Sequence, residues 1–200
     1  MLIFGVCGGS GSGKSFVCQQ LSSHRIPTLN TDNLYHDMIA TDSDCSRALI
    51  AAFGDDIANW QNGIDREKLK QIVFAPDSHE KRLILNKIAH KYIRIETLKW
   101  IDNQRQNGFS AITIDAPLLF ESEFDQMCDY IIAVIAPMDI RIQRICLRDH
   151  ILPEEALKRI SFQIPDDELI KRSHFYIIND GKKSVTTQIR DILTKLNIEP

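Results

Sequence analysis

The stretch GGSGSGKS, residues 8–15, lies almost at the start of a chain of 200 residues. Five of the nine glycines fall within the first thirteen positions. Glycine loses the most conformational freedom on folding, so such a run indicates a backbone path that side chains would block. The spacing Gly8-x-x-x-x-Gly13-Lys14-Ser15 is the pattern of a phosphate-binding P-loop, in which backbone N–H groups surround phosphates.

The residues on either side of this loop supply the context that a P-loop requires. Leu2–Cys7 reads as a short buried strand, and Ser15–Leu21 begins a helix whose N-terminus favours anions. In such a loop the lysine reaches the outer phosphates and the serine hydroxyl ligates magnesium. A flexible linker or a chance match is the other interpretation. The strand and the helix favour nucleotide phosphate binding, with Lys14 and Ser15 in these roles.

The composition is that of an ordinary globular chain, with 44% hydrophobic residues and a formal net charge of −3. This charge gives no overall basic field, so we expect neither nucleic acid nor a membrane surface as a partner. The five cysteines form no C-x-x-C pair, which favours reduced thiols in a cytoplasmic protein. The apolar run at the N-terminus is too short to span a bilayer.

Short apolar runs without alternation predict the buried strands of a parallel sheet. There are five, at residues 2–7, 25–30, 111–115, 130–135 and 175–178. Helical patterns fill the intervals between them. We therefore predict an α/β fold with a doubly wound parallel five-stranded sheet of the P-loop NTPase type.

Two of the intervals are longer than a crossover between parallel strands requires. About seventy residues separate the second strand from the third, and about forty separate the fourth from the fifth. A kinase needs one insertion to hold the acceptor and another to close over ATP. We predict one kinase unit: a core of about residues 1–32, 105–137 and 173–200, a helical acceptor-binding insertion of about 33–104, and a helical lid of about 138–172.

Three acidic residues follow predicted strands, where ligands of an open α/β sheet bind. Asp32 can orient an acceptor hydroxyl and take its proton, or it can cap a helix beginning at Asn33. Beside a P-loop we favour the functional role. Asp115 resembles the Walker B carboxylate that supports magnesium, with a strand-end cap as the alternative. Glu121 is either a substrate contact or a solvated loop residue.

Arg141, Arg144 and Arg148 are spaced to share one face of a helix. Such a stripe is usually a solvated face, but this one leads into the second insertion, where guanidinium groups can clamp a polyphosphate. Arg159 and Gln163 lie one turn apart further along and fit the same lid. No histidine pairs with Cys or His at a ligand spacing, so packing or hydrogen bonding suits His90 better than metal ligation.

These motifs together resemble the dephospho-CoA kinase family over nearly the whole chain. The matching residues are Gly8–Ser15, Asn30–Asp32, Gly63–Arg66, Leu69, Val73, Phe74, Leu85, Asn86, His90, Asp115–Glu121, Arg144, Arg148, Asp149, Glu155, Ala156, Arg159, Ile160, Gln163 and Asn179. The P-loop fits many kinases. Pro117–Glu121 and the series Arg148-Asp149, Arg159 and Gln163 are far more selective.

The resemblance implies transfer of the ATP γ-phosphate to the ribose 3′-hydroxyl of dephospho-CoA, with Mg²⁺, by a nucleotide core, a helical CoA domain and a lid. It assigns catalysis to Lys14, Asp32 and Arg148, and magnesium to Ser15 with Asp115 in the outer sphere. The implied ATP contacts are Gly9, Gly11, Ser12, Gly13, Lys14, Ser15, Phe16, Arg144, Arg148 and Asn179. The implied acceptor contacts are Asp32, His36, His90, Leu118, Glu121, Arg159 and Gln163.

The chain departs from the family pattern at several positions. The family more often has Thr at Cys7 and Phe16, Asp at Asn30, Arg at His36, Pro at Lys91 and Gln at Arg141. Asn30 removes one of two carboxylates near the acceptor, so Asp32 is expected to act alone. His36 weakens or replaces a contact to the phosphates of the acceptor.

Three alternatives compete with this interpretation, and the second of them, a GTP-dependent switch, fails on its motifs. Another small-molecule P-loop kinase would share the core and differ in its first insertion. A GTP-dependent switch needs Asn-Lys-x-Asp, but the nearest stretch is Asn86-Lys87-Ile88-Ala89, and no Asp-x-x-Gly occurs. A catalytically silent nucleotide sensor is disfavoured by the intact Lys14, Ser15 and Asp32.

Overall fold

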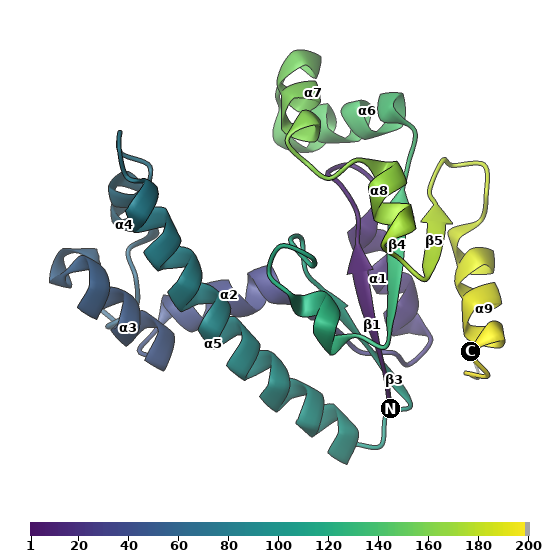
Figure 1. Ribbon diagram of the computed structural model, residues 1–200, viewed down its shortest axis with the longest axis horizontal. Helices are drawn as coiled ribbons and strands as arrows, with labels where there is room; N and C mark the ends of the chain where they lie inside the picture. Colours follow the sequence, from purple (N-terminus) through teal and green to yellow (C-terminus); the bar gives the residue numbers. More distant parts are fainter. Residues whose placement is uncertain (199–200) are drawn as a thin grey trace. The chain divides into compact units, whose positions relative to one another are not determined.

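The computed structural model describes residues 1–198 of the chain. They form two compact units. The first, here called the sheet unit, holds Met1–Asn30 and the chain from Asn103 onward, and the second, the helical unit, holds Thr31–Asp102. Figure 1 shows the strands gathered in the first unit and helices alone in the second. Among the described residues, no helix combines the length and the apolar character that a bilayer crossing needs.

The sheet unit is built on five parallel strands, which confirms the predicted fold class. The strands are β1 (Leu2–Cys7), β2 (Thr28–Asn30), β3 (Ala111–Asp115), β4 (Tyr130–Ile135) and β5 (Phe175–Ile178). Their order is β2-β3-β1-β4-β5, so β3 lies between the first two strands of the chain. This order places the carboxyl ends of β1, β2 and β3 next to one another. The register pairs Asn30 with Asp115.

The second strand is shorter than the sequence predicts, because Arg25 and Ile26 still bond to the last turn of the preceding helix, and only Pro27, whose carbonyl accepts from the Thr113 N–H, begins to pair with β3. Arg25 has a left-handed backbone with φ of 60°. The N–H of Ile26 donates to the Leu21 carbonyl oxygen at 3.3 Å. These are the features of a helix C-terminus, where a left-handed residue turns the chain and late N–H groups satisfy the last carbonyls. The strand therefore begins only at Thr28.

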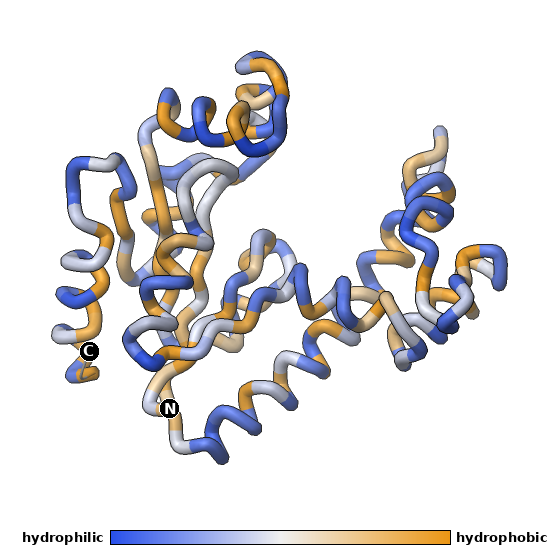
Figure 2. Tube along the Cα trace, turned by 180° about the vertical axis from the view of Figure 1, so that it is seen from behind, coloured by the Kyte–Doolittle hydropathy of each residue, from blue (hydrophilic) through white to orange (hydrophobic). Residues whose placement is uncertain are grey.

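Two helices cover one face of the sheet: α1 (Lys14–Ser23) and α9 (Val185–Lys195). Their apolar sides form a buried cluster with alternate residues of the strands. Its buried members are Phe4, Val6, Val17, Cys18, Leu21, Ile26, Ala111, Ile132, Val134, Ile177, Val185, Ile189, Ile192, Leu193 and Ile198. Figure 2 shows the apolar residues running along the strands and the mixed character of the helices. The cluster fixes the floor beneath the P-loop, because α1 starts from that loop.

Between β4 and β5 the chain forms three helices, α6 (Met138–Asp149), α7 (Pro153–Ser161) and α8 (Asp166–Lys171). They follow the carboxyl end of β4, and α6 and α7 pack on each other (Figure 1). Ile145, Ala156 and Ile160 form a small buried cluster between these two helices. The region predicted as a lid is therefore helical and has a core of its own.

The helical unit consists of α2 (Thr31–Ala40), α3 (Asp44–Phe53), the 3₁₀ turn η1 (Asp55–Ile57), α4 (Arg66–Val73) and most of α5 (His79–Gln106). The 3₁₀ turn η2 (Phe124–Met127) lies in the sheet unit. Capping explains two of the helix starts: the Ser43 hydroxyl accepts from the Ser46 N–H at 3.0 Å, and Asp65 caps α4 in the same way. Buried apolar residues from α2, α3, η1, α4 and the segment before α4 hold the unit together. They are Ile39, Cys45, Leu49, Ile57, Ile64, Leu69 and Val73.

Candidate phosphate-binding site

The loop predicted to bind phosphate joins β1 directly to α1, as its motif requires. Gly11 and Gly13 have φ of 78° and 89°, the left-handed region that side chains disfavour. A Cβ on Gly13 would also overlap the Asn179 amide. The glycines are therefore required by the path of the loop and by the close approach of its neighbours.

Several backbone N–H groups of this loop are available to a ligand. Those of Gly11, Gly13, Lys14 and Ser15 find no acceptor within residues 1–198. The N-terminal turn of a helix leaves such donors unpaired, and its dipole adds positive charge. Donors and dipole together make this end of α1 a site for an anion such as phosphate.

Lys14 forms an ion pair with Asp115 at the end of β3. The Asp115 side chain is 3% exposed, and its second oxygen accepts from the Asn30 Nδ2 at 2.7 Å. Asp115 therefore lies at the strand end where the sequence placed it, with both oxygens engaged. Asn30 acts as a donor here, a role that an ionised carboxylate at this position would not fill.

Arg144 and Asn179 support the loop from behind. The Arg144 guanidinium donates to the carbonyls of Gly11 and Ser12 at 3.1 and 3.3 Å and to the backbone and side-chain oxygens of Asn179. The Asn179 amide donates to the Ser12 carbonyl at 2.9 Å. Arg144 and Asn179, which the sequence predicted to contact ATP, therefore bind carbonyl oxygens of the loop. The N–H groups of the loop face away from these two side chains.

Gln163 also touches the loop. Its Oε1 accepts from the Ser10 N–H at 2.8 Å, and its Nε2 donates to the Ser10 hydroxyl at 3.2 Å. The sequence assigned Gln163 to the acceptor. In the structure its polar atoms bond to Ser10 and to Arg141.

Arg148 and Arg159, the other two lid residues predicted to act, lie away from this network in an exposed cluster. The Arg148 Nε and Nη2 donate to the two oxygens of Asp149 at 2.7 and 2.8 Å, and Arg159 pairs with the same carboxylate. The hydrogen bond from Arg148, with that from Arg159, holds the pKa of Asp149 far below its ordinary value. The Asp149 bond raises the pKa of Arg148 in turn.

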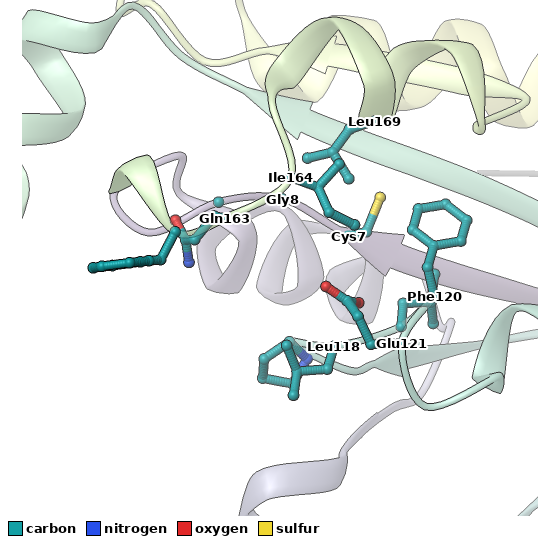
Figure 3. A pocket seen from close by; sticks show the side chains of 12 residues that line it. Cys7, Gly8, Leu118, Phe120, Glu121, Gln163, Ile164 and Leu169 are labelled. Atoms are coloured by element: carbon teal, nitrogen blue, oxygen red, sulfur yellow. The ribbon is translucent and has the colours of Figure 1, made fainter. Parts of the chain in front are cut away.

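A cavity of about 70 Å³ opens beside the loop. Glu121, Leu118 and Gln163 line it, together with the exposed ring of Phe162 (Figure 3). Glu121 and Gln163 reach it from different segments, the first from the turn after β3 and the second from the stretch between α7 and α8. Three predicted acceptor contacts thus border one cavity.

The remaining acceptor candidates belong to the helical unit. Asp32 and His36 are exposed on α2, and His90 is half-buried on α5. Helix α2 begins at Thr31 and not at Asn33, so Asp32 lies in its first turn, and the expected cap position is corrected. The strand β2 ends at Asn30 and the helix begins at the next residue, so the helix starts earlier in the chain than the sequence predicts.

A groove of about 290 Å³ runs over the same unit. Arg66 and Lys70 give it cationic groups, His36 adds an imidazole, and Tyr35 and Phe74 give it aromatic rings. The motif that contains Arg66 matches the family pattern, but the sequence predicts no role for this arginine. These residues come from α2 and from α4 with the residue after it, and they meet because Ile39 of α2 shares a buried cluster with Leu69 and Val73 of α4.

The oxygen donors present suit magnesium better than a softer metal. Within residues 1–198, no group of three or more His, Cys, Asp or Glu side chains is arranged to hold a metal ion. Mg²⁺ typically uses one or two protein ligands, waters and substrate phosphates. The exposed Ser15 at the start of α1 and the engaged Asp115 fit a direct ligand and an outer support, respectively.

Comparison with known proteins identifies the family. The family model for dephospho-CoA kinase matches residues 2–184. The dephospho-CoA kinase of Bacillus cereus is 34% identical over 198 residues, which cover 98% of each chain.

Solved structures agree in fold. A crystal structure of a Thermus thermophilus protein has a TM-score of 0.77 at 26% identity and covers 98% of this chain and 97% of its own. The dephospho-CoA kinase of Campylobacter jejuni has a TM-score of 0.70 at 23% identity and covers 98% of both chains, a likeness of fold. The extent of the family match and the identity to the Bacillus enzyme decide the assignment: this chain belongs to the dephospho-CoA kinase family.

Proposed function

We propose that this chain transfers the γ-phosphate of ATP to the ribose 3′-hydroxyl of dephospho-CoA, which gives coenzyme A and ADP. The observation that carries the proposal is the loop at Gly8–Ser15, with its unpaired N–H groups and Lys14 poised on a buried carboxylate. The family match, which spans both units, supports the choice of acceptor.

In the proposed reaction the 3′-oxygen attacks the γ-phosphorus while the bond from that phosphorus to the bridging oxygen of ADP breaks. Such transfer depends on positioning and on positive charge. The loop N–H groups and Lys14 bind the β- and γ-phosphates, and Lys14 exchanges its Asp115 contact for phosphate oxygens. Arg148 leaves Asp149 to neutralise charge on the transferred group. Asp32 accepts the proton of the attacking hydroxyl.

Magnesium is the expected metal, and the Ser15 hydroxyl would hold it with support from Asp115. When bound, it neutralises charge on the β- and γ-phosphates. Asn30 contributes by holding the Asp115 carboxylate from the side opposite Lys14. This chain therefore presents one carboxylate at the ends of β2 and β3 where the family more often has two.

The groove on the helical unit suits the remaining parts of the acceptor. Dephospho-CoA carries a diphosphate and a long pantetheine arm. His36, Arg66 and Lys70 can meet the negative charges, and the apolar floor formed by Ile39, Leu69 and Val73 can meet the arm. Arg66 and Lys70 are absent from the acceptor contacts that the sequence predicted, and we add them.

We also propose that the enzyme works in the cytoplasm with magnesium ATP and dephospho-CoA as its small-molecule partners. All five cysteines are free thiols in the structure. Thiols persist where the surroundings are reducing, whereas oxidising compartments favour disulfides.

The test is ATP consumption against a panel of acceptors: dephospho-CoA, adenosine, AMP, CMP, shikimate and pantothenate. We expect fast turnover with dephospho-CoA alone, and coenzyme A as the product by mass spectrometry. Faster phosphorylation of a nucleoside monophosphate would move the protein to another group of P-loop kinases and end the proposal.

Asp32→Asn tests the proposed base. It keeps the shape of the side chain but removes its charge and basicity, so kcat should fall by about 10²-fold to 10³-fold, the lower half of general-base effects. ATP affinity should remain unchanged. Asp37→Asn, an exposed change on the same helix, serves as the matched control. A folded Asp32→Asn enzyme with kcat within about threefold of the parent would leave Asp32 with a helix-stabilising role only.

A further inference from the structure

Arg141 is an unusual residue for its position. It lies in the first turn of α6, is 3% exposed, and its guanidinium makes three separate hydrogen bonds. The Nε donates to the Ser10 carbonyl oxygen at 2.9 Å, the Nη2 to the Gln163 Oε1 at 3.3 Å, and the Nη1 to the Asp166 Oδ1 at 2.8 Å. One buried side chain therefore joins the P-loop, the segment after α7 and the start of α8.

These contacts fix the Ser10 peptide units from two sides. The Ser10 N–H donates to Gln163, and the Ser10 carbonyl accepts from Arg141. The Gln163 amide is oriented in turn, because its oxygen accepts from both Ser10 and Arg141. The peptide that starts at the Ser10 carbonyl continues with the Gly11 N–H, so the Ser10 carbonyl direction sets the direction of that unpaired donor.

The burial of the guanidinium argues that this network has a defined geometry. A buried charge is tolerated only when it is paired and its donors are satisfied. Asp166 supplies the opposite charge. The Ser10 carbonyl oxygen and the Gln163 Oε1 accept from two further N–H groups of the guanidinium. A glutamine, which the family more often has at this position, carries no charge to pair with Asp166 and cannot present three donors in a fork.

We propose that Arg141 is a positioning residue for ATP in this chain. It holds the Ser10 carbonyl turned away from the phosphates, so that the N–H groups from Gly11 onward face them. The inference rests on the proposed function only in taking ATP as the ligand of the loop. It gives Arg141 no contact with the nucleotide and no part in acceptor binding.

The test measures nucleotide binding without any acceptor, by calorimetry with magnesium ATP and with ADP, on the full chain. Arg141→Gln should weaken ATP binding about tenfold, the effect of losing one good hydrogen bond to a charged group. Arg141→Lys should not restore affinity, because an ammonium cannot reach three oxygens in the geometry of a fork. The KM for dephospho-CoA should stay within about twofold of the parent value, a change equivalent to less than one weak hydrogen bond.

Gln143→Ala is the matched control, since Gln143 is exposed on the same helix. Its ATP affinity and its unfolding midpoint should equal those of the parent. Asp166→Asn removes the charge that pairs with the buried Arg141 guanidinium and leaves that charge uncompensated beside the loop, so it should weaken ATP binding about threefold or more.

A purely structural role would give a different pattern. Arg141→Gln would then lower the unfolding midpoint, while its ATP affinity, measured well below that temperature, would stay within about twofold of the parent. That result overturns the inference. Should Arg141→Gln fail to fold, Asp166→Asn decides alone, and unchanged ATP binding in that variant also overturns it. Because no acceptor is present, failure of the acceptor panel leaves this test intact.

Discussion

The two ends of helix α6 carry arginines of opposite character. At the inner end Arg141 is buried, and it and Arg144 donate to carbonyls of the P-loop. At the outer end Arg148 is paired with Asp149, and its side chain is 60% exposed. The i, i+3, i+7 spacing predicts a shared face, but what each end of the helix packs against decides what each arginine does.

The difference in exposure implies a difference in freedom. A solvent-exposed ion pair contributes little to stability, so Arg148 can change partner at small cost when phosphate arrives. The buried pair of Arg141 with Asp166 changes partner only at a larger cost, since breaking it leaves an uncompensated charge. The inner end therefore has a fixed, supporting role, and the outer end is suited to respond to the nucleotide.

Lys14→Ala should give the largest loss, because it removes the charge that faces phosphate directly. We expect kcat/KM to fall by about 10³-fold or more, equivalent to about 4 kcal/mol of transition-state stabilisation. The fold should persist, since the lysine packs on no apolar core. Steady-state kinetics and circular dichroism check both points. Turnover near the parent rate in a folded variant would remove the loop from the mechanism.

Arg148→Ala should come next and act on the rate alone. If the exposed arginine moves to the transferred phosphoryl group, kcat should fall by about 10²-fold, as for loss of one preorganised donor. The unfolding midpoint should not change, because a surface pair is lost. A lower unfolding midpoint with a normal kcat would mean that Arg148 supports the fold and does not act on the transferred phosphoryl group.

Arg144→Ala should show the converse pattern. It removes donors to the Gly11 and Ser12 carbonyls, so the loop loosens. ATP binding should weaken about tenfold, and the unfolding midpoint should fall, because buried carbonyls lose their partner. Calorimetry and thermal denaturation measure the two effects. An unchanged midpoint would mean that water replaces the guanidinium without cost.

Asp149→Asn should have the smallest effect, a small loss of stability that is present at neutral pH and disappears in strong acid. The folded-state pKa of Asp149 lies below its unfolded value of about 3.9, so the carboxylate stabilises the fold above that pH and loses this effect as the pH falls through the folded value. The parent should therefore exceed the variant slightly in midpoint at pH 7. The difference should vanish in strong acid. A difference that grows on acidification would contradict the assigned direction of the pKa shift.

Local signals in the sequence were enough to find the strands β1, β3, β4 and β5, whose bounds agree with the predicted ones. They failed at β2, where a helix C-terminus around Arg25 took residues that the apolar pattern gave to the strand. The P-loop was found because its residues are consecutive.

The support of that loop could not be found in the same way. Folding alone brings Ser10, Arg141 and Gln163 together. Ser10 is more than a hundred residues away in sequence from both Arg141 and Gln163. One signal was available: Arg141 lies four residues before Ile145, on the side of α6 that docks. The roles of Asp32 and His36 stay predictions, and the Asp32→Asn variant tests the first of them.

The hydrogen bond from Asn30 to Asp115 makes the residue that is tolerated at one of these positions depend on the residue at the other. With Asn at position 30, Asp115 has a neutral donor beside it at 2.7 Å. With Asp at position 30, two like charges would share that space unless a cation or a proton came between them. A mutation at either position is therefore tolerated or not according to the residue at the other.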